Sequence, residues 1–172
     1  MALTQRLARV APEYLDRCRA SALDSPGASP NWDPPAEDLL DTDWATWGLI
    51  RHCRGPGADP GTATLLDRAI SGDLDGDLGF LDHDEVYDGF ADPPRQLTPA
   101  AVADIATGLD AIDADALLAR LPGSPEEASV ACGFGPVFHG DLAAHLAEHL
   151  TALREFYREA ARRRRCVVVW VD

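Results

Sequence analysis

The two ends of the chain carry patterns typical of β-strands. LTQRLARV, residues 3–10, alternates apolar and polar positions well enough to predict a half-buried strand. CVVVWV, residues 166–171, is a short apolar run rich in β-branched residues, which predicts a buried strand. We expect the two strands to lie in the same sheet, with helices packed on one face, so that both ends of the chain are held in place.

Between these ends, apolar residues recur at the spacing of an amphipathic helix. This spacing, together with Pro in first turns and Thr or Asp at capping positions, predicts helices over residues 11–22, 39–50, 98–112, 113–121 and 141–163. The longest helix carries a single apolar stripe made of Leu142, Leu146, Leu150, Leu153, Tyr157 and Ala160. Residues 62–72 form too short a pattern to distinguish helix from strand, and residues 25–35 and 55–61 are expected to be loops.

The order of these elements predicts the α+β class. We expect a single domain over residues 1–172, in which a small sheet that includes the N-terminal and C-terminal strands is packed by about five to six helices. With 172 residues, 46% of them hydrophobic, the chain is long enough to bury a sizeable core.

Targeting signals and cysteine spacing favour a cytoplasmic protein. The longest apolar run falls far short of the roughly 20 residues that span a bilayer, and the N-terminus lacks the apolar stretch of a signal peptide. No Cys-x-x-Cys pair occurs among the cysteines, which argues against a zinc knuckle or a thioredoxin-type motif. We expect free, buried thiols at Cys18, Cys53, Cys132 and Cys166.

Charge is distributed unevenly along the chain. The net charge is −14, and residues 31–127 hold 21 of the 29 acidic residues but only five of the fifteen basic ones. All basic residues are arginine, which excludes lysine Schiff-base chemistry, pyridoxal phosphate attachment and a P-loop. The acidic middle predicts a basic protein partner and argues against binding to nucleic acid or to anionic membranes. The alternative is a solvated surface that keeps the protein in solution.

Candidate partner-binding residues lie in the most acidic stretch and in a proline-rich loop. The acidic candidates are Asp73, Asp75, Asp77, Asp82, Asp84, Glu85 and Asp88. Trp32 is added as an interface anchor, on the condition that its side chain is exposed. The acidic stretch also resembles the start of a calcium loop, but Leu78 stands where such loops need Gly and Asp84 where they carry Glu.

One pattern suggests a metal site. His145-Leu-Ala-Glu148-His149 reads as H-x-x-E-H, in which two histidines on one helix face bind zinc and the glutamate polarises a water. The third ligand would be His139, Glu155 or Glu159. Helix phase places Glu148 towards solvent and His149 at the boundary of the apolar stripe, so a helix that happens to carry two histidines is the favoured interpretation.

The segment GFGPVFHG, residues 133–140, combines glycines with aromatic residues. It is expected to be a turn that packs Phe134 and Phe138 onto the core, and the alternative is the rim of a binding surface.

Several segments together resemble a known family. The chain contains APEYL, which is similar to T-P-E-E-L of the family, then LDTDWATWGLI, AISGD, YDGFADPPRQLTPAAVADIATGLDAID, LREFYREAA and a closing VVVWV. In this order they resemble the YfbM-like family of bacterial proteins, domain of unknown function 1877. The resemblance spans nearly the whole chain and implies a single α+β domain, but it implies no activity. The long helix of the family does not typically carry H-x-x-E-H, which argues against a shared zinc function.

These observations lead to two functional hypotheses. The first is a non-enzymatic intracellular binding protein without a cofactor, which recognises a basic polypeptide through its acidic surface, as an immunity protein that neutralises a toxin would. The second is a metal-dependent hydrolase that uses His145, Glu148 and His149. A small-molecule sensor or a structural protein is a third class that the sequence neither supports nor excludes.

Overall fold

The computed structural model describes residues 4–56, 59–74, 76–136 and 138–172. Four antiparallel strands form one sheet in the order β2-β1-β4-β3. The strands are β1 (Gln5–Val10), β2 (Leu39–Asp41), β3 (Arg95–Leu97) and β4 (Cys166–Val171). β1 and β4 pair along their whole length at the centre of the sheet, which confirms that the two terminal strands share a sheet. The α+β class is also confirmed.

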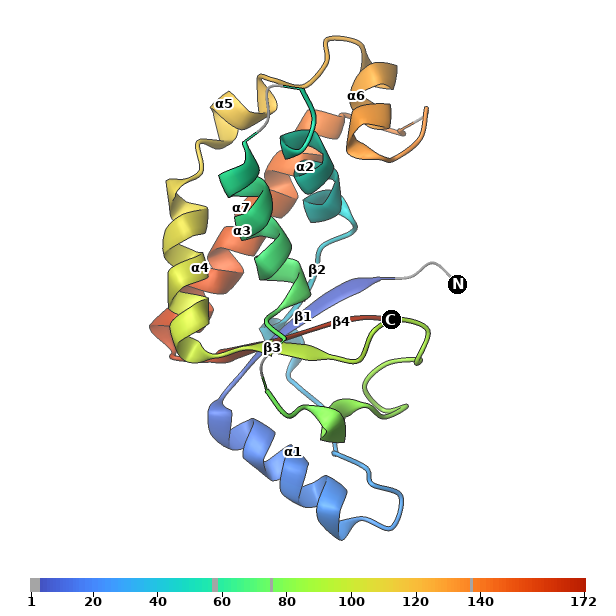
Figure 1. Ribbon diagram of the computed structural model, residues 1–172, viewed down its shortest axis with the longest axis vertical. Coiled ribbons are helices and arrows are strands. Elements are labelled where there is room, and N and C mark those ends of the chain that lie inside the picture. Colours follow the sequence, from blue (N-terminus) through green and yellow to red (C-terminus); the bar gives the residue numbers. More distant parts are fainter. Residues whose placement is uncertain (1–3, 57–58, 75, 137) are drawn as a thin grey trace.

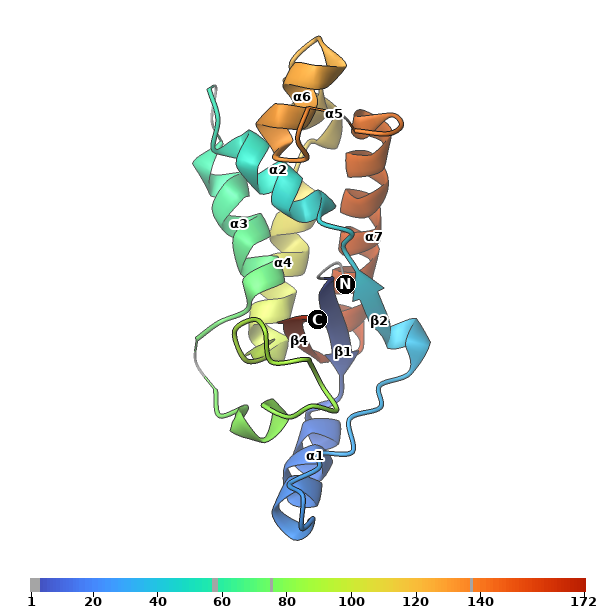
Figure 2. The same cartoon turned by 90° about the vertical axis from the view of Figure 1, so that its right-hand side faces the viewer.

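One face of the sheet is covered by a layer of four helices (Figures 1 and 2). They are α2 (Ala45–Cys53), α3 (Pro60–Ser71), α4 (Pro99–Ala111) and α7 (Leu142–Arg162). The main core lies between these helices and the side chains of Leu7, Val167 and Val169 from the sheet. Two short helices, α5 (Ala114–Leu118) and α6 (Pro125–Cys132), lie at the end of this layer away from the sheet.

The opposite face of the sheet is also covered, so the expectation of helices on one face was wrong. Helix α1 (Pro12–Asp24) and the 3-10 turn η2 (Gly79–Leu81) lie on this side and form a second core with Val168 and Trp170. The reason is the sequence of β4 itself: successive strand residues point to opposite faces, and an unbroken apolar run therefore needs cover on both.

The segment expected to be one helix over residues 39–50 divides into two elements. Leu39 and Leu40 belong to β2, where Leu40 pairs with Leu7 of β1, and a second 3-10 turn, η1 (Ala36–Asp38), precedes them. Asp43 and Trp44 then adopt left-handed backbone angles, with φ of 43° and 58°, before α2 begins at Ala45. Pairing with the neighbouring strand overrides the local helical spacing here.

Three further elements complete the comparison with the sequence. Residues 62–71, for which the pattern did not distinguish helix from strand, lie in α3, and Gly72 follows its last turn. The Asp59 side chain accepts a hydrogen bond from the Thr62 amide at the start of this helix. The short strand β3 and helix α6 were not expected. β3 is held by distant segments, since it pairs with β4 and its Gln96 forms a bridge with Asp73. The predicted caps at Thr98 and Asp113 are confirmed for α4 and α5.

Two side chains of α7 fasten the helical layer together. The Tyr157 hydroxyl is fully buried and donates a hydrogen bond of 2.5 Å to the Ala69 carbonyl of α3, and burial raises its pKa. The Arg154 guanidinium donates hydrogen bonds to the carbonyls of Leu109 and Ile112 at the end of α4. Both residues lie in LREFYREAA, so this family-like segment has a structural role.

No helix in the described part of the chain is long and apolar enough to span a membrane.

Candidate functional site

The acidic stretch leads from α3 to β3 and lies beside the second core (Figure 1). Asp73 at its start is half-buried and forms a two-hydrogen-bond ion pair with Arg68, with N–O distances of 2.8 and 2.7 Å. These hydrogen bonds from Arg68 lower the pKa of the Asp73 carboxyl. Asp73 lies just after α3, and its charge is compensated by Arg68 of that helix. Asp75 lies outside the described residues.

Five further candidates are exposed carboxylates, and we call them the acidic surface: Asp77, Asp82, Asp84, Glu85 and Asp88. None of them forms a salt bridge with another residue that the structure describes. Asp82 accepts a hydrogen bond from the Tyr87 hydroxyl, which raises the pKa of Tyr87 to about 12. Glu85 accepts a hydrogen bond from the Ser29 hydroxyl. These contacts order the loop but leave its negative charge uncompensated.

Two apolar side chains in the same stretch are almost fully exposed. Leu74 and Phe90 each have a relative solvent exposure of 82%. Large apolar side chains surrounded by charged ones are a common feature of protein interfaces, where they act as anchors. The stretch thus combines uncompensated charge with two candidate anchors.

Trp32 does not share this exposure. Its ring makes edge contacts with Tyr14 and Trp170, with centroid distances of 5.7 and 5.8 Å, and it packs against the second core. The condition that made Trp32 an anchor candidate is not met, because the indole is partly buried by its own chain.

The two histidines of the H-x-x-E-H pattern lie one turn apart on α7. Their ring centroids are 4.5 Å apart, and their side chains are mostly buried, with exposures of 19% for His145 and 21% for His149. Each Nε2 atom lies 4.0 Å from one carboxylate oxygen, Oδ2 of Asp43. We call Asp43, His145 and His149 the Asp–His–His cluster; one ligand atom from each residue lies within 4.8 Å of the other two.

The turn between β2 and α2 brings Asp43 to this position. The Asp43 amide donates a 2.8 Å hydrogen bond to the Asp41 side chain, and its left-handed backbone angle directs the chain over α7. Non-glycine residues with such angles are uncommon and are often found at functional sites. Asp43 and His145 are about a hundred positions apart in the sequence, so no spacing rule could have paired them.

The other residues of the predicted metal site stay outside the cluster. Glu148 and Glu155 are exposed, and Glu159 pairs with Arg162 and Arg163. His139 is exposed and lies near His145, but it is not part of the cluster. Asp43, which lies outside the H-x-x-E-H pattern, is thus the carboxylate that approaches the two histidines.

A cavity of about 760 Å³ opens beside the cluster. Asp43 and His145 form part of its wall, together with His139 and Arg51. The remaining wall is largely aromatic, and it is formed by Trp44, Trp47, Phe134 and Phe138 together with Gly48, Cys132 and Gly133. Volume and lining are in the range of small-molecule sites, which are mostly apolar with few polar groups.

The two aromatic residues of segment 133–140 pack onto the core, as expected for a turn. Phe134 and Phe138 pack against the main core, with their ring centroids 5.4 Å apart, and they also line the cavity. Phe134 lies so close to α2 that a β-carbon on Gly48 would approach its ring to 2.7 Å. The absence of a side chain at Gly48 therefore leaves the space that the Phe134 ring occupies at the cavity wall.

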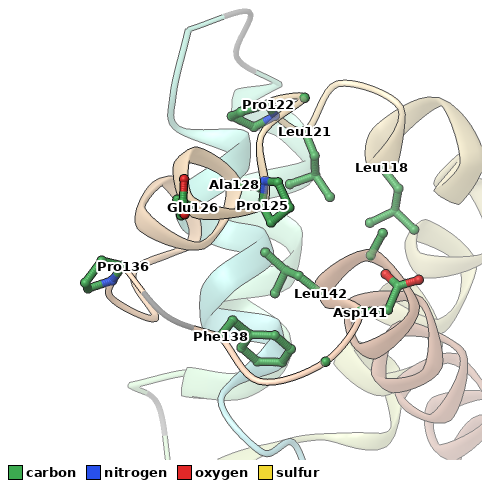
Figure 3. A pocket seen from close by; sticks show the side chains of 13 residues that line it. Leu118, Leu121, Pro122, Pro125, Glu126, Ala128, Pro136, Phe138, Asp141 and Leu142 are labelled. Carbon is green, nitrogen blue, oxygen red and sulfur yellow. The ribbon is translucent and has the colours of Figure 1, made fainter.

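A second cavity, of about 550 Å³, lies between α5, α6 and the start of α7 (Figure 3). Its wall is formed mainly by apolar side chains, among them Leu118, Leu121, Leu142 and Phe138, which also lines the first cavity. Two carboxylates, Glu126 and Asp141, also line it, and Asp141 caps α7 by accepting a hydrogen bond from the Ala144 amide.

Thiol chemistry is disfavoured throughout. All four cysteines are free and buried, as predicted. Cys132 lines the first cavity, but desolvation raises its pKa to about 11 and keeps it a neutral thiol, which is a poor nucleophile.

The fold and these features define a small α+β protein with an acidic loop on one side and an aromatic cavity on the other. A family model described as "Domain of unknown function (DUF1877)" matches residues 28–170, and the chain belongs to this family. The resemblance found in the sequence is thereby confirmed.

Among solved structures, the chain is similar to YfbM from Escherichia coli, which is described as a protein of unknown function. The identity is 13%, the TM-score is 0.58, and the match covers 98% of this chain and 99% of that chain. At this identity the likeness shows a shared fold alone. No curated protein matches the chain.

Proposed function

We propose that the protein is a non-enzymatic binding module that recognises a basic polypeptide through its acidic surface, as an immunity protein or a similar inhibitor would. The observation that supports this most is the combination of five carboxylates without salt-bridge partners in the described chain and two exposed apolar side chains, Leu74 and Phe90, in one loop. Charge speeds and orients the encounter of two proteins, while buried apolar anchors supply most of the affinity.

A basic partner follows from the sign of the charge. Arg68 and Arg95 lie next to the loop and are paired with Asp73 and Asp92. Arg19 of α1 also contacts the loop, through a hydrogen bond to the Asp77 carbonyl, and it pairs with Asp16. A second acidic protein or a nucleic acid would be repelled by the remaining carboxylates. The four buried thiols further support a reducing compartment, and the proposal includes a cytoplasmic location.

The test is affinity capture from native lysate at low and at high salt, with two matched variants. The first replaces Asp77, Asp84 and Asp88 by Asn. The second replaces Glu126 of α6 and Glu148 and Glu155 of α7, which are exposed carboxylates outside the loop, by Gln. We expect a stoichiometric basic protein that salt releases, because exposed charges are screened over about 8–10 Å at physiological salt. Only the first variant should lose it.

A Phe90→Ala variant separates apolar anchoring from charge, and we expect it to weaken capture even at low salt. The proposal fails if the captured protein is acidic, or if it binds the first variant as well as it binds the unmodified chain.

A metal-dependent hydrolase is a second candidate, favoured by the meeting of Asp43 with His145 and His149 beside a cavity. Glu148, which the sequence pattern assigns as the base, is exposed and outside the cluster. His139 lines the cavity beside His145 and is better placed for proton transfer. Hydrolysis of ester or amide substrates by zinc-loaded protein, lost on His139→Ala, would support this candidate, and the same rate in that variant would refute it.

A further inference from the structure

We infer that Asp43, His145 and His149 form a binding site for a divalent transition-metal ion of the zinc type, at the wall of the aromatic cavity. Two imidazoles and one carboxylate are a ligand set that suits Zn²⁺ and Fe²⁺. The inference concerns metal binding alone, and it requires neither the basic partner nor hydrolysis.

The distances are close to those of a loaded site. Metal–ligand bonds of about 2.0–2.2 Å place the ligand atoms of a tetrahedral site about 3.3–3.5 Å apart. Asp43 Oδ2 lies 4.0 Å from Nε2 of both histidines. The Asp43 side chain is 68% exposed, so it can move towards both histidines without disturbing the core. All three ligand atoms lie within 4.8 Å of one another, and rotation of the imidazole rings shortens the remaining separation.

The two histidines are held more firmly than the aspartate. Each histidine directly precedes a leucine, Leu146 or Leu150, that is fully buried in the main core. The burial of these leucines fixes the orientation of the helix and thereby the face that carries the imidazoles. The rings of Phe138 and Phe134 contact His145, with centroid distances of 5.2 and 6.1 Å. A site with two preorganised ligands loses little conformational freedom when the third closes.

The imidazoles also have unused polar atoms. Neither ring forms a hydrogen bond within the described chain, although both are mostly buried and both Nε2 atoms face the same carboxylate. Mostly buried polar groups normally have a partner. If the histidines served only as packing residues, nothing would require their Nε2 atoms to converge on one carboxylate oxygen.

Three protein ligands leave one coordination position open, which distinguishes catalytic and ligand-binding metal sites from closed structural ones. Because Asp43 and His145 line the cavity, the fourth ligand would be water or a small molecule held there.

The experiment is titration of metal-free protein with zinc chloride by calorimetry, and with cobalt chloride by visible absorption. We expect one ion per chain and a cobalt spectrum without a thiolate charge-transfer band, since the cluster contains no cysteine. Asp43→Asn should weaken binding at least about tenfold, because even indirect partners of a metal are worth 10–100-fold. Asn tolerates the left-handed backbone of this position, so this variant should fold normally.

Glu148→Gln is the matched control, because it also replaces one exposed carboxylate by its amide, but outside the cluster. It should bind zinc as the unmodified chain does. His149→Ala should also lose binding, with circular dichroism to verify that it is folded. Absence of saturable zinc binding, or binding that Asp43→Asn leaves unchanged, would overturn the inference. Loss of binding in Glu148→Gln alone would instead restore the H-x-x-E-H interpretation.

Discussion

Individual side chains of α7 form hydrogen bonds that link this helix to its neighbours. Arg154 is the clearest case, because its guanidinium satisfies two carbonyls at the end of α4, where helix carbonyls lack partners within the helix. Its neighbour Arg158 lies one turn further on and forms only an exposed pair with Asp110. Two arginines of the same helix therefore differ in role: Arg154 binds backbone carbonyls of α4, and Arg158 forms a surface ion pair.

We expect Arg154→Ala to lower the free energy of unfolding by about 1–3 kcal/mol, the usual loss when charged hydrogen bonds to half-buried groups are removed. Arg158→Ala should cost no more than about 1 kcal/mol, as exposed ion pairs contribute little. Urea denaturation of both variants measures the difference. Equal effects would show that the Arg154 hydrogen bonds contribute no more than an exposed ion pair.

At the scale of elements, one carboxylate joins three of them. Asp38 in η1 is 5% exposed, and its Oδ1 atom lies 2.8 Å from Arg9 Nε in β1 and 3.0 Å from an Arg163 nitrogen just past α7. The pairing holds the edge of the sheet against the end of the longest helix.

Asp38→Ala should cost about 2–4 kcal/mol, because removing one partner of a buried ion pair leaves the other charge uncompensated. Asp110→Ala serves as the exposed comparison and should change stability by about 0–1 kcal/mol. Thermal unfolding followed by circular dichroism reports both values. A loss below that of Asp110→Ala would mean that Arg9 and Arg163 find equivalent partners elsewhere.

The same scale shows where prediction from sequence succeeds and where it does not. Helix α7 and the caps of α4 and α5 could be predicted, because the residues that form them lie within a few positions of each other. β2 and β3 are three residues each and exist only because longer strands pair with them. Leu39 and Leu40 fit a helical spacing equally well, and the neighbouring strand decides between the two.

At the scale of the whole molecule, two cores share one sheet. Cys53 and Cys132 are buried in the main core, and Cys18 and Cys166 in the second. Burial raises the pKa of Cys132 and of Cys166 to about 11 each, which keeps both thiols neutral in the folded state.

This predicts a specific pH dependence of stability. Neutral thiols stabilise the fold fully below their ordinary pKa of 9.0, and this contribution is lost as the pH rises towards the folded value of about 11. The loss at about pH 10 is on the order of 1 kcal/mol per thiol. Urea midpoints between about pH 8 and pH 10 should fall steeply. A variant with Ala at positions 132 and 166 should show a flatter profile, and parallel profiles would contradict the assignment.

The sequence by itself determined what depends on nearby residues: the terminal strands, most helices and their caps, the buried thiols, the acidic middle and the family resemblance. These follow from periodicity, capping chemistry and composition, all of which act over a few positions. Only the tertiary structure decided that α1 and η2 cover the second face of the sheet, that Trp32 packs inward, and that Asp43 meets His145 and His149. Such contacts join residues from distant segments, and it is the packing of β2, α2 and α7 that sets their distances.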